Sequence, residues 1–186
     1  MKKDFKRLKK LNNCSGFTLV EMLVTLVIVI MVSTMMAEVV KLGVDQYERS
    51  LRSSESKVLC STISTILTSE LSYTQEVHVD SSGNVTKFQS QNFAINNNLS
   101  MVDTDGSGTN GYGEIVLANC EDSSEVRNIL GTGSYTRGLL AKVTTLTYNS
   151  AEHCFHVVLS IGLNGSEYMS YPFDVINVNR TEAITD

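Results

Sequence analysis

The first strong feature of the hydrophobic pattern is one apolar stretch, FTLVEMLVTLVIVIMVSTMMA, which runs from Phe17 to Ala37. As an α-helix rising about 1.5 Å per residue, this stretch would be about 31 Å long, close to the hydrocarbon thickness of a bilayer. The pattern therefore predicts a membrane-spanning helix over residues 17–37.

Beyond the span, apolar residues continue from Val40 to Leu71, mostly three, four or seven positions apart, and charged residues fill the positions between them. This spacing is typical of a helix with one apolar face. We expect the span and this stripe to form one helix that ends near Tyr73. Its second half, residues 38–73, would be amphipathic and packed on the chain's own domain.

After Tyr73, short runs of β-forming residues alternate with polar turns. Val77–Val79 and Val85–Phe88 flank a turn-forming segment, and Asn164-Gly165 is typical of a tight hairpin turn. Further strands are predicted at 115–118, 139–148, 154–161 and 168–178. A long helix leading into such runs predicts an α+β fold, with an antiparallel β-sheet head over residues 74–186.

Charge is divided unevenly along a chain whose net charge is −5. Six basic residues and one acidic residue precede Phe17, whereas nineteen of the twenty acidic residues follow Gly16. Basic residues ahead of the span predict that the N-terminus lies in the cytoplasm and the long C-terminal part outside. The acidic head argues against a broad nucleic-acid-binding face, and no direct nucleic-acid partner is predicted.

Cleavage by ordinary signal peptidase fits this arrangement poorly. A secretory signal carries its small-residue cleavage site after the apolar segment, whereas Ser15 and Gly16 precede it and no A-x-A sequence follows Ala37. A lipoprotein signal also fits poorly, because Cys14 precedes the apolar segment and follows Asn13. The basic leader therefore points to another kind of processing.

Glu21 is the one ionisable residue between Phe17 and Ala37. A carboxylate within a spanning helix costs up to about 2.5–3.5 kcal/mol at the bilayer centre, so it usually marks a function or a partner. The alternative is that Glu21, one turn into the span, reaches back to the lipid headgroups.

The string Gly16-Phe17-Thr18-Leu19-Val20-Glu21-Met22-Leu23, behind a basic leader, resembles the processing motif of type IV pilins and pseudopilins. The resemblance implies that prepilin peptidase removes residues 1–16 by cutting after Gly16, and that Phe17 becomes the methylated N-terminus. Glu21 would then pair with the α-amino group of a neighbouring subunit, which neutralises both charges in a low-dielectric filament core.

The same resemblance implies storage in the cytoplasmic (inner) membrane, followed by packing into an extracytoplasmic filament with other subunits and an assembly platform. The GFTLVEM start and Glu70-Leu71 are similar to J-type minor pseudopilins, and the irregular head favours a minor subunit. A type IV pilus, type II secretion and competence stay open as the system. The alternative function is a single-pass anchored surface protein that binds a ligand and does not polymerise.

One acidic segment has the spacing of a calcium-binding loop. Asp103, Asp105, Ser107 and Glu114 fall at its first, third, fifth and twelfth positions, and Gly106 falls at the sixth. A Gly-rich surface loop ahead of a strand is the plainer interpretation, so calcium is kept as an alternative and no cofactor is predicted.

Cys60, Cys120 and Cys154 would remain after removal of Cys14 with the leader. A Cys120–Cys154 disulfide is the candidate pairing in an oxidising compartment, and the alternative is no bond at all. Cys154 and His156 share one face of a strand, but two candidate ligands without a clear third and fourth predict no metal site. No phosphate loop, serine elbow or His-Glu-x-x-His helix is present, and we predict that the protein is not an enzyme.

Overall fold

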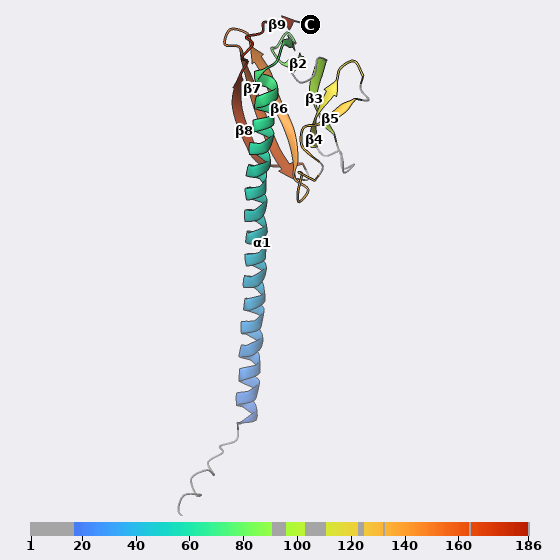
Figure 1. The fold of residues 1–186 in the computed structure, drawn as a ribbon. Coiled ribbons are helices and arrows are strands. Elements are labelled where there is room, and N and C mark those ends of the chain that lie inside the picture. Colours follow the sequence, from blue (N-terminus) through green and yellow to red (C-terminus); the bar gives the residue numbers. More distant parts are fainter. Residues whose placement is uncertain are drawn as a thin grey trace, which may run out of the picture. The chain divides into compact units, whose positions relative to one another are not determined.

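The structure is a computed structural model that describes residues 17–90, 96–102, 111–122, 125–131, 133–163 and 165–185. Its contacts divide the chain into two compact units, Met1–Glu48 and Arg49–Asp186. The elements, shown in Figure 1, are α1 (Leu19–Ser72), β1 (Glu76–Val79), β2 (Val85–Gln89), β3 (Asn96–Val102), β4 (Glu114–Asn119), β5 (Val126–Asn128), β6 (Leu140–Asn149), β7 (Cys154–Leu163), β8 (Ser166–Ile176) and β9 (Ala183–Thr185).

The described part of the first unit is the N-terminal portion of α1. Every side chain from Phe17 to Glu48 is exposed, including the whole apolar stretch. Among the described residues, α1 is the one helix long and apolar enough to cross a membrane by length and composition. The expected long helix is confirmed, and it ends at Ser72, one residue before the predicted Tyr73.

In the second unit, the C-terminal portion of α1 supplies one side of the hydrophobic core. Leu59, Ile63, Leu67 and Leu71 follow one another at intervals of four residues, which places them on one face of the helix. The last three are fully buried and belong to the same core cluster as residues of both sheets. The predicted packing of the amphipathic half on its own domain is therefore confirmed.

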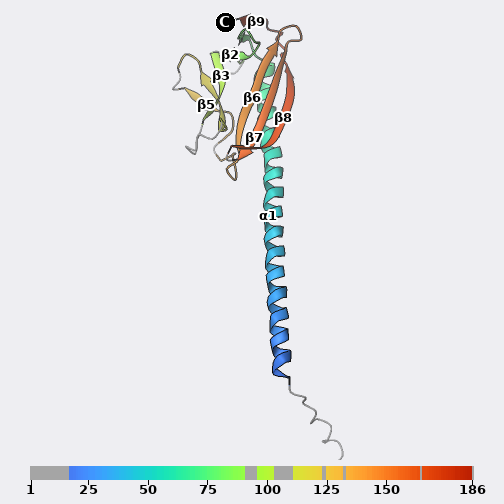
Figure 2. The ribbon, with the colours of Figure 1, turned by 180° about the vertical axis from the view of Figure 1, so that it is seen from behind.

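The head contains two sheets rather than one. A six-stranded sheet has the order β5-β4-β3-β2-β1-β9, and a three-stranded sheet has the order β6-β7-β8. Seen from opposite sides in Figures 1 and 2, the C-terminal portion of α1 lies along the three-stranded sheet. The prediction of an antiparallel sheet needs one correction, because β9 pairs with β1 in parallel. β9 follows β8 in the sequence and is not joined to β1 by a hairpin, so no tight turn forces the two strands to be antiparallel.

Two backbone bridges join the sheets, Asn84 with Thr147 and Gly113 with Ala141. In the second, each amide donates to the other residue's carbonyl at 2.9 Å. A side chain at Gly113 would meet the carbonyl oxygen of Val102 at 2.5 Å, so only glycine fits at this junction.

The predicted hairpins form as expected. Between β1 and β2, Asp80 accepts hydrogen bonds from the backbone amides of Ser82 and Asn84, both at 2.8 Å. Between β7 and β8, Leu163 lies opposite Ser166. The sole proline, Pro172, lies in β8, an edge strand, where a missing backbone donor is tolerated.

The segment after β8 closes the C-terminal end of α1. Side chains of Asn177, Asn179 and Thr181 donate to the carbonyl of Thr74, at 3.3, 3.2 and 3.0 Å. Helix ends leave unsatisfied carbonyls, and these donors cover the one just past the last turn. The C-terminal segment thus fixes the point where the helix meets the head.

Candidate functional site

Thr18 starts α1 as its N-cap. Its side-chain Oγ1 accepts a hydrogen bond from the amide of Glu21 at 3.3 Å, and its carbonyl oxygen accepts one from Met22 at 3.2 Å. An N-cap threonine satisfies one of the amides that a helix start leaves without a partner. The cap places Phe17 just outside the helix, with 66% of its surface exposed.

Glu21 lies in the first turn of α1, three residues after the cap. Thr18 and Glu21 form the T-x-x-E pattern of a capping box, and a negative charge in the first turn is favoured by the helix dipole. This gives Glu21 a local role in starting the helix, beside the intersubunit role that the resemblance implies. Sequence reasoning missed the role of Thr18, although T-x-x-E ahead of an apolar run was the signal for it.

The apolar stretch behind this cap has no cover within the described chain. Its large side chains from Leu19 to Val44 are 46–81% exposed, and they face all sides of the helix. A helix that is apolar all round needs lipid or other helices around it. Of the predicted processing residues, Phe17 is described, whereas Gly16 lies outside the described residues.

Residues 11–37 match the family model described as the prokaryotic N-terminal methylation motif. No curated protein and no solved structure matches the chain. The chain therefore carries the methylation motif of type IV pilins and pseudopilins, and its long helix packed on a β-sheet head is a pilin-like α+β fold. The motif implies processing by prepilin peptidase, and the apolar helix behind it is consistent with anchoring in the inner membrane before assembly.

The expected disulfide between Cys120 and Cys154 is not formed, because Cys60, Cys120 and Cys154 are all free thiols. Cys120 follows β4 of the six-stranded sheet, whereas Cys154 begins β7 of the three-stranded sheet. Cys60 is buried on α1, and burial raises the pKa of its thiol. The predicted pairing depends on both cysteines lying in strand regions, but strand patterns do not show that β4 and β7 belong to different sheets.

Most of the calcium-loop candidate lies outside the described residues, namely Asp103, Asp105 and Ser107. Glu114 is described, and it is the first residue of β4, opposite Val102 at the end of β3. The calcium alternative therefore stays a prediction.

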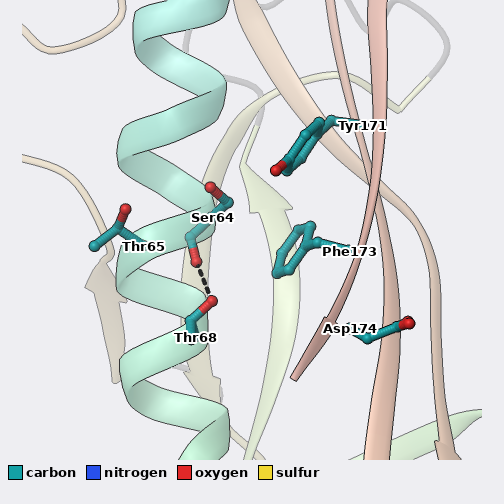
Figure 3. A pocket seen from close by; sticks show the side chains of 6 residues that line it. All are labelled: Ser64, Thr65, Thr68, Tyr171, Phe173 and Asp174. Atoms are coloured by element: carbon teal, nitrogen blue, oxygen red, sulfur yellow. Dashed lines mark hydrogen bonds between the residues drawn. The ribbon is translucent and has the colours of Figure 1, made fainter. Parts of the chain in front are cut away.

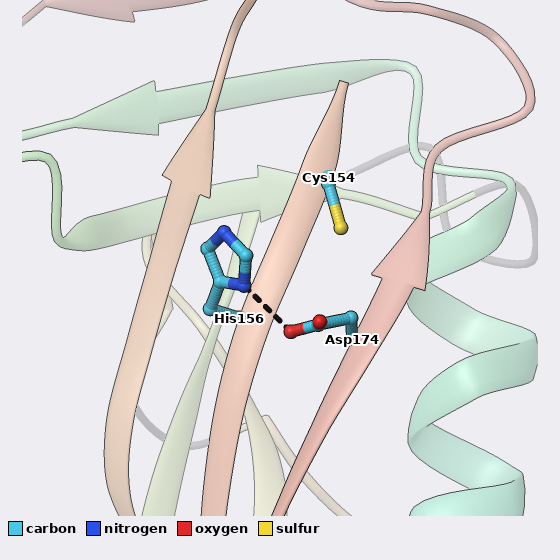
Figure 4. A group of neighbouring side chains, drawn as sticks. All are labelled: Cys154, His156 and Asp174. Atoms are coloured by element: carbon cyan, nitrogen blue, oxygen red, sulfur yellow. Dashed lines mark hydrogen bonds and ion pairs between the residues drawn. The ribbon is translucent and has the colours of Figure 1, made fainter. Parts of the chain in front are cut away.

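Cys154 and His156 do share a strand face, and the structure adds a third side chain to them, Asp174 of β8 (Figure 4). His156 Nδ1 lies 2.6 Å from Asp174 Oδ1. Sequence reasoning missed Asp174, because it lies on the next strand and its position depends on the pairing register.

A shallow pocket of about 250 Å³ lies between α1 and β8. Figure 3 shows Tyr171 and Phe173 of β8 facing the helix, where Ser64, Thr65 and Thr68 line the other side. The two rings stack with centroids 5.7 Å apart, and Thr68 donates to the backbone carbonyl of Ser64 at 2.7 Å. Asp174 also lines the pocket. The hydroxyls of Ser64, Thr65 and Thr68 all donate to backbone carbonyls of α1, so none of them is paired with a base.

Proposed function

We propose that this protein is a structural subunit of a type IV pilin-like filament, with a minor pilin or pseudopilin role. The observation that carries the proposal is the methylation motif over residues 11–37, which includes the Thr18 cap and the exposed apolar start of α1. A bilayer can cover such a helix while the subunit is stored, and helices of neighbouring subunits can cover it in a filament. The role is structural, and it requires no catalytic group.

Processing follows from the same motif. Prepilin peptidase cuts between Gly16 and Phe17 and methylates the new N-terminus at Phe17. The cut leaves an α-amino group one residue ahead of the Thr18 cap, within a helical turn of Glu21. In a filament core, the Glu21 carboxylate of one subunit pairs with this amino group on a neighbour, which sets the axial stagger of the two helices.

The partners are therefore prepilin peptidase, other pilin or pseudopilin subunits, the assembly platform and the inner membrane. The N-terminus faces the cytoplasm and the head lies outside, as the basic leader ahead of the span favours. The minor assignment rests on the similarity to J-type minor pseudopilins. Counting this subunit against the others in sheared filaments by quantitative mass spectrometry tests it, since a minor subunit is far outnumbered.

The central test is mass spectrometry of the N-terminal peptide from cells with an active prepilin peptidase. The wild-type chain is expected to begin at methylated Phe17, and Gly16→Ala is expected to retain residues 1–16. An unprocessed wild-type chain would sink the proposal and favour the anchored surface protein that does not polymerise.

Assembly is tested separately with three variants that should all be processed. If the charge of Glu21 pairs with a neighbour, both Glu21→Ala and Glu21→Gln lose at least about tenfold of the subunit from the sheared filament fraction. If Glu21 only supports the start of α1, Glu21→Gln assembles normally, because glutamine also serves in a capping box. Glu38→Gln, an exposed carboxylate farther along α1, is the matched control and should assemble like the wild type.

A further inference from the structure

One face of the three-stranded sheet, across β7 and β8, brings together three chemically different ligand groups. The Cys154 thiol, the His156 imidazole and the Asp174 carboxylate each offer one atom, and these atoms all lie within 4.8 Å of one another. Cys154 is 8% exposed, whereas the side chains of His156 and Asp174 are 44% and 66% exposed. In Figure 4, the thiol and the carboxylate converge on the space beside the imidazole. The thiol is thus the buried member of the group, and the imidazole and the carboxylate are accessible to solvent.

A register shift in the sheet creates this group. At the turn, Leu163 lies opposite Ser166, but an irregularity between Ile161 and Gly162 moves the pairing by one residue. Beyond it, His156 lies opposite Asp174. Without the shift, His156 would lie opposite Phe173, and the carboxylate would point to the other face.

Gly162 is required at this irregularity. A side chain there would approach the ring of Tyr112 at 2.7 Å and the carbonyl oxygen of Ser166 at 2.8 Å. The glycine therefore permits the shift that brings Asp174 beside His156.

Sulfur, imidazole nitrogen and carboxylate oxygen together form the donor set that suits Zn²⁺. Bonds of about 2.0 Å to nitrogen and oxygen, at tetrahedral angles, would place those two atoms about 3.3 Å apart. His156 Nδ1 and Asp174 Oδ1 are 2.6 Å apart as hydrogen-bonded partners, so a small side-chain rotation of two exposed groups opens the space.

We infer that Cys154, His156 and Asp174 bind one Zn²⁺ ion, which ties β7 to β8. Three protein ligands leave one coordination position for water or for a ligand from outside the chain. The proposed roles of Phe17 and Glu21 in a filament do not depend on this ion, so this site stands independently of the proposed function.

Two interactions oppose the ion. Burial, followed by the charges of Asp174 and Glu152, raises the pKa of the Cys154 thiol, so metal binding must displace its proton. The hydrogen bond between His156 and Asp174 must also be given up. An exposed hydrogen-bonded pair of this kind contributes little to stability, because water competes for both groups. The competing structure is that pair alone, beside a buried thiol of the core.

The test uses the full chain in mild detergent, stripped of metal with a chelator and titrated with Co²⁺ as a spectroscopic substitute for Zn²⁺. One equivalent is expected to give the near-ultraviolet band of a cobalt–thiolate bond, and added Zn²⁺ should remove it. Asp174→Asn and His156→Gln should weaken binding at least about tenfold, and Cys154→Ala should abolish the thiolate band. Cys120→Ala and His78→Gln are the matched controls and should bind like the wild type.

Zn²⁺ at about one hundred times its dissociation constant should also raise the unfolding midpoint by about 5 °C or more in the wild type. Asp174→Asn should lose this rise. It keeps the shape of an exposed side chain, so it folds even if Cys154→Ala does not. Equal binding by wild type and Asp174→Asn, or a thiolate band that survives in a folded Cys154→Ala, would overturn the site.

Discussion

At the scale of single residues, Tyr135 shows how the head satisfies a polar group inside its core. Its hydroxyl oxygen accepts a hydrogen bond from the amide of Ile115 at 2.9 Å, and Ile115 is fully buried in β4. Burial, and then the charge of Glu114, raise the pKa of Tyr135 to about 12 although the amide of Ile115 acts in the opposite direction. The folded head therefore holds this phenol in its neutral form.

The raised pKa predicts a specific loss of stability in alkali. In the unfolded chain Tyr135 ionises near its ordinary pKa of about 10. The raised pKa therefore contributes its full amount to the free energy of unfolding below pH 10, and this contribution is lost as the pH rises toward 12. Tyr135→Phe should cost about 1 kcal/mol at pH 8, because the amide of Ile115 loses its acceptor. Between pH 10 and 12, the free energy of unfolding should fall less in this variant than in the wild type. The difference between the two decreases should reach up to about 2–3 kcal/mol.

Urea unfolding of the detergent-solubilised chain, followed by circular dichroism from pH 8 to pH 12, measures both effects. Tyr73→Phe, at a residue that is 47% exposed, is the control and should follow the wild-type profile. Stability curves of wild type and Tyr135→Phe that stay parallel above pH 10 would contradict the assignment.

At the scale of elements, α1 changes its environment along its length without changing its conformation. Residues up to Glu48 are exposed on all sides, whereas Leu59, Ile63, Leu67 and Leu71 face the core. The chain has no proline between Leu19 and Ser72 to interrupt the helix. The same helix therefore offers one part to lipid or other helices and another part to its own head.

Two substitutions on one helix separate packing from helix propensity. Leu67→Ala removes a fully buried side chain and should lower the free energy of unfolding by about 2–5 kcal/mol. Val58→Ala removes a side chain that is 65% exposed and should change it by less than about 0.5 kcal/mol. Thermal and urea unfolding of the two variants measure the difference. Equal effects would mean that this face of α1 is not packed on the sheets.

The elements found from sequence were those with a clear hydrophobic period. The helix and the strands β1, β2, β4, β6, β7 and β8 were predicted within a few residues of their observed bounds. β3 was missed because it begins with Asn96-Asn97-Asn98, which reads as a turn, yet Asn97 is only 4% exposed between β2 and β4. β9 was missed because three residues at the chain's end carry too short a pattern.

The candidate sites also differ in how far the sequence alone could predict them. The N-terminal motif is local in sequence, so Phe17 and Glu21 could be proposed as candidate residues without a structure. The group at Cys154 could not, because Asp174 joins it only through the one-residue shift at Gly162. The Cys120–Cys154 pairing failed for a related reason, since strand patterns do not say which sheet each strand enters.

At the scale of the whole molecule, the two units suit different solvents, one apolar and one aqueous. The first unit exposes large apolar side chains, and the second unit has its own buried core built from α1 and both sheets. Burial of that core should be sufficient for the second unit to fold without the first.

A chain that starts at Arg49 should therefore be a soluble monomer without detergent and should unfold cooperatively, with a midpoint within a few degrees of the head in the full chain. A chain that starts at Thr65 is the sharper comparison, because it also lacks Leu59, Cys60 and Ile63, which are 7%, 2% and 0% exposed. Losing three buried side chains should cost more than about 5 kcal/mol and abolish the cooperative transition. Light scattering and calorimetry distinguish the outcomes. If the chain starting at Arg49 aggregates as the shorter one does, the prediction is wrong, and the head needs residues 17–48 in order to fold.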